Sequence, residues 1–335
     1  MIHPSDSGGI PSRTLASLEA SWKSGYEPVA TGDILVIDEA GMVGTRQLER
    51  VMGQLQQQGC KVVLVGDPDQ LQPIQAGKPF RDIAQNNGAA RLTEIRRQNS
   101  AWQRKASRDL ANGHTEMALQ TYADQGAVHN SLDRDQAITA LVDDYIADCE
   151  RNGQETTRLA MAHRRIDVHA INQAIRSARN ASGLPKQETL FKTDNGPRAF
   201  ANGDRILFTR NDKILGVRNG MLGTVTDVGG RLLSVQFDAD EGGLGRALTF
   251  SPQQFPSIDH GFAVSIHRSQ GCTIDRSYVL FSRTMDKNLT YVALTRHREE
   301  TKFYTAPDIA PKHIRSEPEL FAPRDFRARA PVRSR

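Results

Sequence analysis

The stretch ILVIDEA at residues 34–40 is followed along the chain by a second of the same kind, VVLVGDPDQ at residues 62–70. Each begins as a short, wholly apolar run rich in β-branched residues and stops abruptly at acidic residues. This pattern is typical of a strand that is buried on both faces of a parallel sheet. Because ligands bind at the carboxyl edge of open α/β sheets, the two stretches predict both an α/β fold and a site.

The residues that end these strands indicate a chemistry. In nucleoside-triphosphate hydrolases the first acid, here Asp38, holds Mg²⁺, and the second, Glu39, orients and deprotonates the attacking water. An amide on the neighbouring strand, here Gln70, can sense the γ-phosphate. The alternative is a buried strand that merely ends in Asp-Glu, and the first stretch alone supports both interpretations equally. The second stretch favours the hydrolase.

Composition leaves room for this interpretation. The 335 residues suffice for two domains and a small insert, and 38% hydrophobic with 24% charged residues is ordinary for a globular protein. The sequence has neither a membrane-length apolar run nor a signal segment, so we expect a cytoplasmic protein. The three cysteines show no C-x-x-C spacing, which suggests neither a disulfide framework nor a zinc site. The net charge of +4 is compatible with a polyanionic partner without establishing one.

The order of the elements predicts how the chain is organised. Helical and strand-like runs alternate up to about residue 100, with a third short extended element at residues 91–98, and a second α/β unit begins there. From Gly203 onward the runs become short strands, and Gly229-Gly230 joins two of them in a tight hairpin. These strands predict a small antiparallel barrel inserted in the second unit. The proline- and arginine-rich end of the chain cannot bury a core and is expected to be disordered.

Three further clusters carry groups that bind phosphate. His267-Arg268-Ser269-Gln270-Gly271 follows a buried strand at a predicted strand-to-helix turn, although the start of a surface helix would look similar. The run at residues 291–298, YVALTRHR, places arginines at the end of a helical stretch. Arg96-Arg97-Gln98 offers another cation after the first unit. In isolation, the last two would be a solvated helix end and a charged connector.

Taken together and in this order, the clusters resemble the motifs of superfamily 1 DNA helicases. Residues 38–41 are similar to motif II, 66–73 to motif III, 95–98 to motif IV, 265–271 to motif V and 291–296 to motif VI. Within that superfamily the chain resembles the RecD-like 5′-to-3′ helicases, and among them the helicase portion of conjugative relaxases of the Ti-plasmid type, which also share SRTLASLE at residues 12–19. The resemblance covers nearly all of residues 10–306.

The resemblance implies a fold of two RecA-like P-loop NTPase-type domains. The first, incomplete, spans residues 1–98 and the second spans 99–204 and 256–310. An SH3-like β-barrel insertion occupies 205–255, and a disordered basic tail 311–335. The SH3-like insertion helps to grip single strands in that family, and Phe208 and Arg210 are its candidate contacts here.

The resemblance also implies roles for individual residues. ATP and Mg²⁺ would be the cofactors, with Asp38 as the metal ligand, Glu39 as the general base and Arg296 as the arginine finger. Single-stranded DNA would be the partner, and the conjugative transfer machinery a possible second one. The remaining assignments are Asp67, Gln70 and Arg97 toward the nucleotide, and Thr14, His267, Ser269 and Gln270 toward the DNA.

One departure from the family concerns the P-loop, G-x-x-x-x-G-K-[ST], which is expected before residue 10. Gly77-Lys78 is the only Gly-Lys pair in the sequence, but Gln72 stands at the first glycine position and Pro79 at the Ser/Thr position. The resemblance therefore implies a chain truncated at its N-terminus, without the strand that carries this loop. Two functions stay open: an ATP-driven helicase motor impaired by the missing loop, and a non-catalytic remnant that binds single-stranded DNA.

Overall fold

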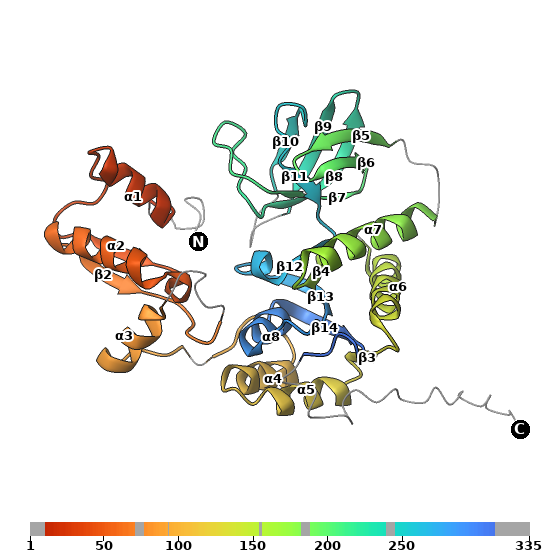
Figure 1. Cartoon of the computed structure of the whole chain (residues 1–335), viewed down its shortest axis with the longest axis horizontal. Helices are drawn as coiled ribbons and strands as arrows, with labels where there is room; N and C mark the ends of the chain where they lie inside the picture. The colour runs from red at the N-terminus through yellow and green to blue at the C-terminus, as the bar shows by residue number, and fades with distance from the viewer. Residues whose placement is uncertain are drawn as a thin grey trace, which may run out of the picture. The chain divides into compact units, whose positions relative to one another are not determined.

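The computed structural model describes residues 11–70, 77–92, 94–153, 156–181, 188–238 and 245–311. The chain divides into two compact units, residues 1–95 and 96–335, and each is described here by itself (Figure 1). The expected disordered tail lies almost wholly outside the described residues. None of the helices that the structure describes has the length and apolar character to cross a membrane.

The first unit is a small parallel α/β layer. Its elements are α1 (Leu15–Lys23), β1 (Ile34–Ile37), the short 3₁₀ helix η1 (Ala40–Met42), α2 (Thr45–Gln57), β2 (Lys61–Leu64) and α3 (Pro79–Asn87). Strands β1 and β2 pair in parallel with Ile37 opposite Leu64. The amphipathic helix α2 buries Leu48, Val51 and Leu55 against the inner face of these strands.

The outer face of this two-stranded sheet is exposed. Ile34 and Val36 are 62% and 53% exposed, and Val63 is 45% exposed, whereas Ile37 is buried. The prediction of burial on both faces is therefore wrong for the described residues. The reason is that the described helices pack on one face only, so that burial alternates along each strand.

The second unit contains a five-stranded parallel sheet in the order β12-β4-β13-β14-β3. Its strands are β3 (Val128–Asn130), β4 (Arg158–Ala162), β12 (Ala263–Ser265), β13 (Ile274–Leu280) and β14 (His297–Thr305). Every residue of β4 is buried. This strand is therefore covered on both faces of the sheet.

Helices cover both faces of that sheet. Tyr278, Leu280 and Tyr304 point into one apolar cluster with α6 (Arg134–Asn152) and α7 (Arg165–Ala181). Because side chains alternate along a strand, Phe303 points to the opposite face, where its ring lies 5.9 Å from that of Tyr122. The helices α4 (Ala101–Ala111), α5 (Thr115–Asp124) and α8 (Lys287–Leu294) complete the unit (Figure 1).

An antiparallel sheet is inserted between α7 and β12. Its order is β10-β9-β8-β7-β11, with β7 (Arg205–Phe208), β8 (Leu222–Gly229), β9 (Leu232–Phe237), β10 (Ala247–Phe250) and β11 (Ile258–His260). A separate hairpin, β5 (Thr189–Thr193) and β6 (Gly196–Phe200), places Phe191 and Phe200 in the same apolar cluster. The antiparallel part therefore begins before the predicted residue 205, because the core of the inserted sheet includes these two side chains.

The third extended element expected at residues 91–98 is not a strand among its described residues. Gln98 is buried, and its side-chain amide donates to the backbone carbonyl of Thr295 at 3.2 Å. The end of this segment is therefore attached to the rest of the second unit by a side-chain hydrogen bond and not by strand pairing.

Candidate nucleotide and nucleic-acid sites

The first unit brings its predicted acidic residues to one edge. Asp38 and Glu39 follow β1 directly, and the turn that begins at Asp67 follows β2. The two loops are in backbone contact, because Ala40 N donates to Val65 O at 2.9 Å. The predicted convergence of the two stretches is therefore present within this unit.

Two glycines permit that contact. A Cβ on Gly41 would lie 2.9 Å from the carbonyl oxygen of Asp67, and one on Gly66 would lie 3.0 Å from the amide nitrogen of Ala40. Both distances are too short for a side chain to be accommodated without a backbone shift. Gly41 and Gly66 thus allow the two acidic loops to approach each other closely.

Glu39 has an unusual backbone. Its φ of 52° and ψ of 37° place it in the left-handed region, and it is the only non-glycine residue with positive φ among the described residues. Such conformations cost about 1–2 kcal/mol and concentrate at functional sites. The Glu39 carboxylate makes no hydrogen bond or ion pair with other described residues, so it is available to a ligand.

The neighbouring polar groups are organised around Asp67. Its carboxylate accepts hydrogen bonds from the backbone N–H of Asp69 at 2.9 Å and from the side-chain amide of Gln70 at 3.2 Å. Asp38 accepts one from the backbone N–H of Glu39 at 2.9 Å. Gln70 is thereby held on the side of Asp67, next to the loop that carries Asp38 and Glu39.

The donor set at this edge fits Mg²⁺ but does not by itself form a protein metal cage. Among the described residues no group of three or more His, Cys, Asp or Glu side chains could hold a metal ion. Mg²⁺ commonly uses one or two carboxylates together with waters and substrate phosphates, and Asp38 fits that role. Gly77-Lys78 does not form a phosphate cradle, because Lys78 is followed by Pro79 at the first turn of α3.

The second unit gathers the two predicted arginines. Arg97 donates to the Thr295 carbonyl at 3.0 Å, and Arg296 donates to the Thr295 hydroxyl at 3.3 Å and to the Val292 carbonyl at 3.1 Å. Arg97 and Arg296, which lie far apart in the sequence, therefore both donate hydrogen bonds to Thr295, directly after α8. Arg296 is only 2% exposed, so an encounter with a phosphate requires its side chain to leave these acceptors.

His297 completes this cluster and was not singled out from the sequence. It is fully buried, and neither ring nitrogen makes a well-formed hydrogen bond with the described residues. Burial, followed by the charges of Arg97 and Arg296, lowers the pKa of His297 to about 3. A buried neutral imidazole therefore lies close enough to both arginines for their charges to affect it.

The predicted DNA-binding residues have different environments. His267 is exposed, Gln270 is partly buried, and Ser269 is fully buried with its hydroxyl donating to the Ile266 carbonyl at 2.8 Å. This burial argues against direct DNA contact by Ser269 and gives it a role in the 3₁₀ turn η2 (Ile266–Ser269). Thr14 caps α1, where its hydroxyl accepts a hydrogen bond from Ser17 N at 3.0 Å.

His163 was also missed in the sequence. It follows the buried strand β4, as Asp38 follows β1, and its ring centroid lies 5.6 Å from that of His267. Its place after a fully apolar run was the signal that could have found it.

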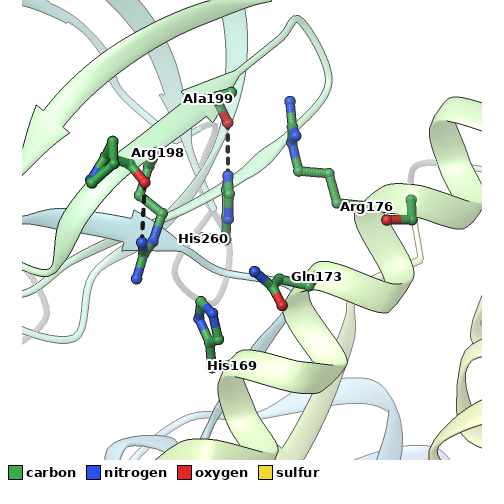
Figure 2. A pocket seen from close by; sticks show the side chains of 8 residues that line it. His169, Gln173, Arg176, Arg198, Ala199 and His260 are labelled. Atoms are coloured by element: carbon green, nitrogen blue, oxygen red, sulfur yellow. Dashed lines mark hydrogen bonds between the residues drawn. The ribbon is translucent and has the colours of Figure 1, made fainter.

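A pocket of about 320 Å³ lies between α7, β6 and β11 (Figure 2). Arg176 in its wall pairs with Glu188 at 2.8 Å and with Asp204 at 3.1 Å, and Arg198 pairs with Asp259 at 2.8 Å. The carboxylates offset both guanidinium charges, so the pocket is not strongly cationic. We assign no ligand to it. It is lined by His169, Gln173, Arg176, Ser177, Pro197, Arg198, Ala199 and His260.

The chain is similar in sequence to several known proteins. The AAA domain family matches residues 5–133. The chain is 41% identical over 297 residues to the conjugal transfer protein TraA of Agrobacterium fabrum, which covers 88% of this chain and 26% of that protein. It is 25% identical over 285 residues to the ATP-dependent RecD2 DNA helicase of Deinococcus radiodurans, covering 82% of this chain and 36% of the helicase.

Solved structures show the same fold. The Pif1 helicase from Candida albicans superposes with a TM-score of 0.58 at 16% identity, covering 91% of this chain and 80% of that one. In the comparison with TraA, this chain spans about a quarter of the length of the TraA proteins that it matches. The similarity to TraA over 88% of this chain groups it with the superfamily 1 helicase proteins of the TraA type, and its α/β architecture is similar to that of Pif1.

Proposed function

We propose that this chain is the helicase-motor part of a conjugative DNA-transfer protein, coupling ATP hydrolysis to 5′-to-3′ movement along single-stranded DNA in the cytoplasm. The observation that carries the proposal is the acidic edge of the first unit. There a strained Glu39, whose carboxylate is not engaged by other described residues, follows β1, and its loop packs against the Asp67 turn. A carboxylate in this position is suited to orient and deprotonate a water molecule.

The other residues receive roles from the same proposal. Asp38 holds Mg²⁺, which when bound supplies electrostatic stabilisation to the phosphates. Gln70, positioned by Asp67, senses the terminal phosphate. Arg97 and Arg296, which are gathered at Thr295, neutralise charge that develops during phosphoryl transfer.

We further propose that the antiparallel sheet inserted after α7 is an SH3-like module that grips the strand. We assign residues 1–98 to one RecA-like domain and residues 99–204 with 256–310 to the other. Arg210 supports the role of the module, because its guanidinium lies 5.3 Å from the centre of the Phe255 ring and its side chain is exposed. Phe208 does not support that role, because it is fully buried in the core of the inserted sheet.

The missing phosphate cradle leads to a second candidate function. Without backbone amides and a lysine to bind the β- and γ-phosphates, the 335 residues alone are expected to bind single-stranded DNA without turnover. The non-catalytic DNA-binding function is favoured by this single feature of the sequence.

A phosphate-release assay with saturating single-stranded DNA separates the two functions. We expect no appreciable turnover from the chain alone. Fusion of the TraA-family segment with its strand and P-loop ahead of Ser12 is expected to produce a DNA-stimulated ATPase. In the fusion, Glu39→Gln should lower turnover by about 10² to 10⁴-fold and Arg296→Ala by about 10³ to 10⁵-fold.

The matched control is Glu49→Gln on the exposed side of α2, which should leave turnover unchanged. If the folded fusion binds nucleotide but neither active-site substitution changes its rate, the catalytic assignment is wrong. Turnover by the unfused chain that Glu39→Gln abolishes would instead show that no added P-loop is required.

A further inference from the structure

The carboxyl edge of the parallel sheet in the second unit carries a polar cluster. Three neighbouring strands, β12, β4 and β13, end there. His267 follows β12, His163 follows β4, and Ser282 and Thr284 follow β13. Within this sheet, strand β4 is followed along the chain by β12, its neighbour on one side, and the next strand, β13, is its neighbour on the other side. The strand order therefore reverses at β4, and ligands of α/β proteins bind at such topological switch points.

The cluster is ordered by its own hydrogen bonds. His163 Nδ1 lies 2.8 Å from the hydroxyl of Thr284, which lies 2.9 Å from the hydroxyl of Ser282. The rings of His163 and His267 lie 5.6 Å apart with their planes inclined at 33°. His267 and Thr284 are exposed and His163 is partly exposed, so a ligand can reach all three.

The surroundings of His267 disfavour its protonation in the free protein. Burial, followed by the neighbouring His163, lowers the pKa of His267, and Asp286 at the start of α8 opposes this effect. Arg164, next to His163, is engaged by Asp167 at 2.7 Å. Exposed charged residues near the cluster along the chain are Arg165, Arg268, Arg283 and Lys287.

A metal ion is a poor occupant for this cluster. Two imidazoles with hydroxyl neighbours provide fewer ligands than a zinc site needs. The described residues contain no larger group of His, Cys, Asp or Glu that could complete such a site. An anion is a better occupant, because it favours the protonated form of an imidazole beside it and accepts its hydrogen bond.

We propose that His163 and His267 together bind one phosphodiester group of single-stranded DNA, and that this binding takes up a proton from solvent. The inference rests on the proposed DNA-binding function and adds a residue, His163, and a proton linkage to it. One imidazole becomes imidazolium and donates to a phosphate oxygen, while Thr284 holds the His163 ring in place. The affinity for DNA therefore rises as the pH falls through the range in which histidines titrate.

The test is fluorescence anisotropy of the full chain with a labelled oligothymidine, at constant low ionic strength, from about pH 7.5 to about pH 6. For the uptake of one proton, the association constant should rise by up to about tenfold per pH unit. His163→Gln and His267→Gln should each flatten this dependence. His114→Gln, an exposed histidine at the start of α5, should retain it.

His163→Phe supplies a second variant, because it keeps an aromatic ring against His267 but carries no proton. Circular dichroism verifies that each variant is folded. A folded His163→Phe protein that retains the full pH dependence overturns the inference, as does wild-type binding that is independent of pH. Either result would leave the proposed DNA-binding function intact, whereas failure of the wild-type chain to bind at low salt would overturn both.

A parallel titration with ATP and no DNA separates the two sources of phosphate. Weak ATP binding that neither histidine substitution affects supports the assignment to the DNA backbone. ATP binding with the same pH dependence, lost in His163→Phe, would assign the cluster to a nucleotide and overturn the inference.

Discussion

His297 provides a test of the arginine cluster that does not depend on activity. We expect the second unit to lose stability as the pH falls below about 6.5, and His297→Gln to remove part of that loss. Glutamine is neutral at every pH and similar in size to histidine. The substitution therefore removes the titration without adding a charge near Arg97 and Arg296.

The magnitude follows from the burial of the imidazole. The pKa of His297 is lowered to about 3 in the folded unit, by burial first and then by the two arginines. In the unfolded chain it returns to about 6.5. Between these values the unfolded state binds a proton that the folded state excludes, so stability is complete above about pH 6.5 and falls toward acid. At pH 5 the loss from this residue is about 2 kcal/mol, at 1.36 kcal/mol for each of about 1.5 units.

The two tryptophans allow the second unit to be followed alone. Trp102 on α4 packs edge-on against Tyr122, with ring centroids 5.3 Å apart, whereas Trp22 lies on α1 of the first unit. Urea unfolding in a Trp22→Phe background, monitored by Trp102 fluorescence, therefore reports the second unit. Wild type should lose about 2 kcal/mol more than His297→Gln between pH 7.5 and pH 5.

Comparing how the unfolding free energies of wild type and His297→Gln change with pH cancels any pH-independent destabilisation by the substitution. It also cancels the contributions of His129 and His260, whose pKa values are lowered mainly by burial. Parallel pH dependences for wild type and His297→Gln would refute the assignment of a buried neutral imidazole. His114→Gln is the matched control and should follow wild type.

Two further predictions concern stability. Glu39→Asn should stabilise the first unit by about 0.5–1 kcal/mol, because asparagine tolerates the left-handed backbone that Glu39 adopts at a φ of 52°. Urea unfolding monitored by Trp22 in a Trp102→Phe background measures this, and a loss of stability would contradict backbone strain at Glu39. Asp148→Ala should destabilise the second unit by about 3–5 kcal/mol, because it leaves the buried Arg158 and the partly buried Arg276 without a shared carboxylate. Asp143→Ala, on the same helix but without an ion pair among the described residues, is its control, and equal effects of the two substitutions would refute the argument.

Local sequence predicted the elements that depend on short-range patterns. The apolar run before Asp38 forms a strand that ends at Ile37, and the run before His267 forms a strand that ends at Ser265, because strand formation and its termination are encoded within a few residues. The hairpin at Gly229-Gly230 is present for the same reason, with Gly230 at a φ of 58°. The ordered motifs also allowed the family resemblance to be stated from residues alone.

Side-chain environments could not be predicted in this way. The sequence does not show that Ser269 and Arg296 are buried, or that His163 lies against His267 from a strand about 100 positions earlier in the chain. These properties depend on which distant segments pack together, and no local period records that packing.

The sequence by itself therefore determined the α/β class, the strand ends and the residue types available for phosphate chemistry. Only the tertiary structure decided how these residues are used. It exposes one face of β1 and β2, places Glu39 in a left-handed backbone, and buries His297 near the charges of Arg97 and Arg296. The physical reason is that strand formation follows from neighbours along the chain, whereas burial, strain and pKa follow from neighbours in space.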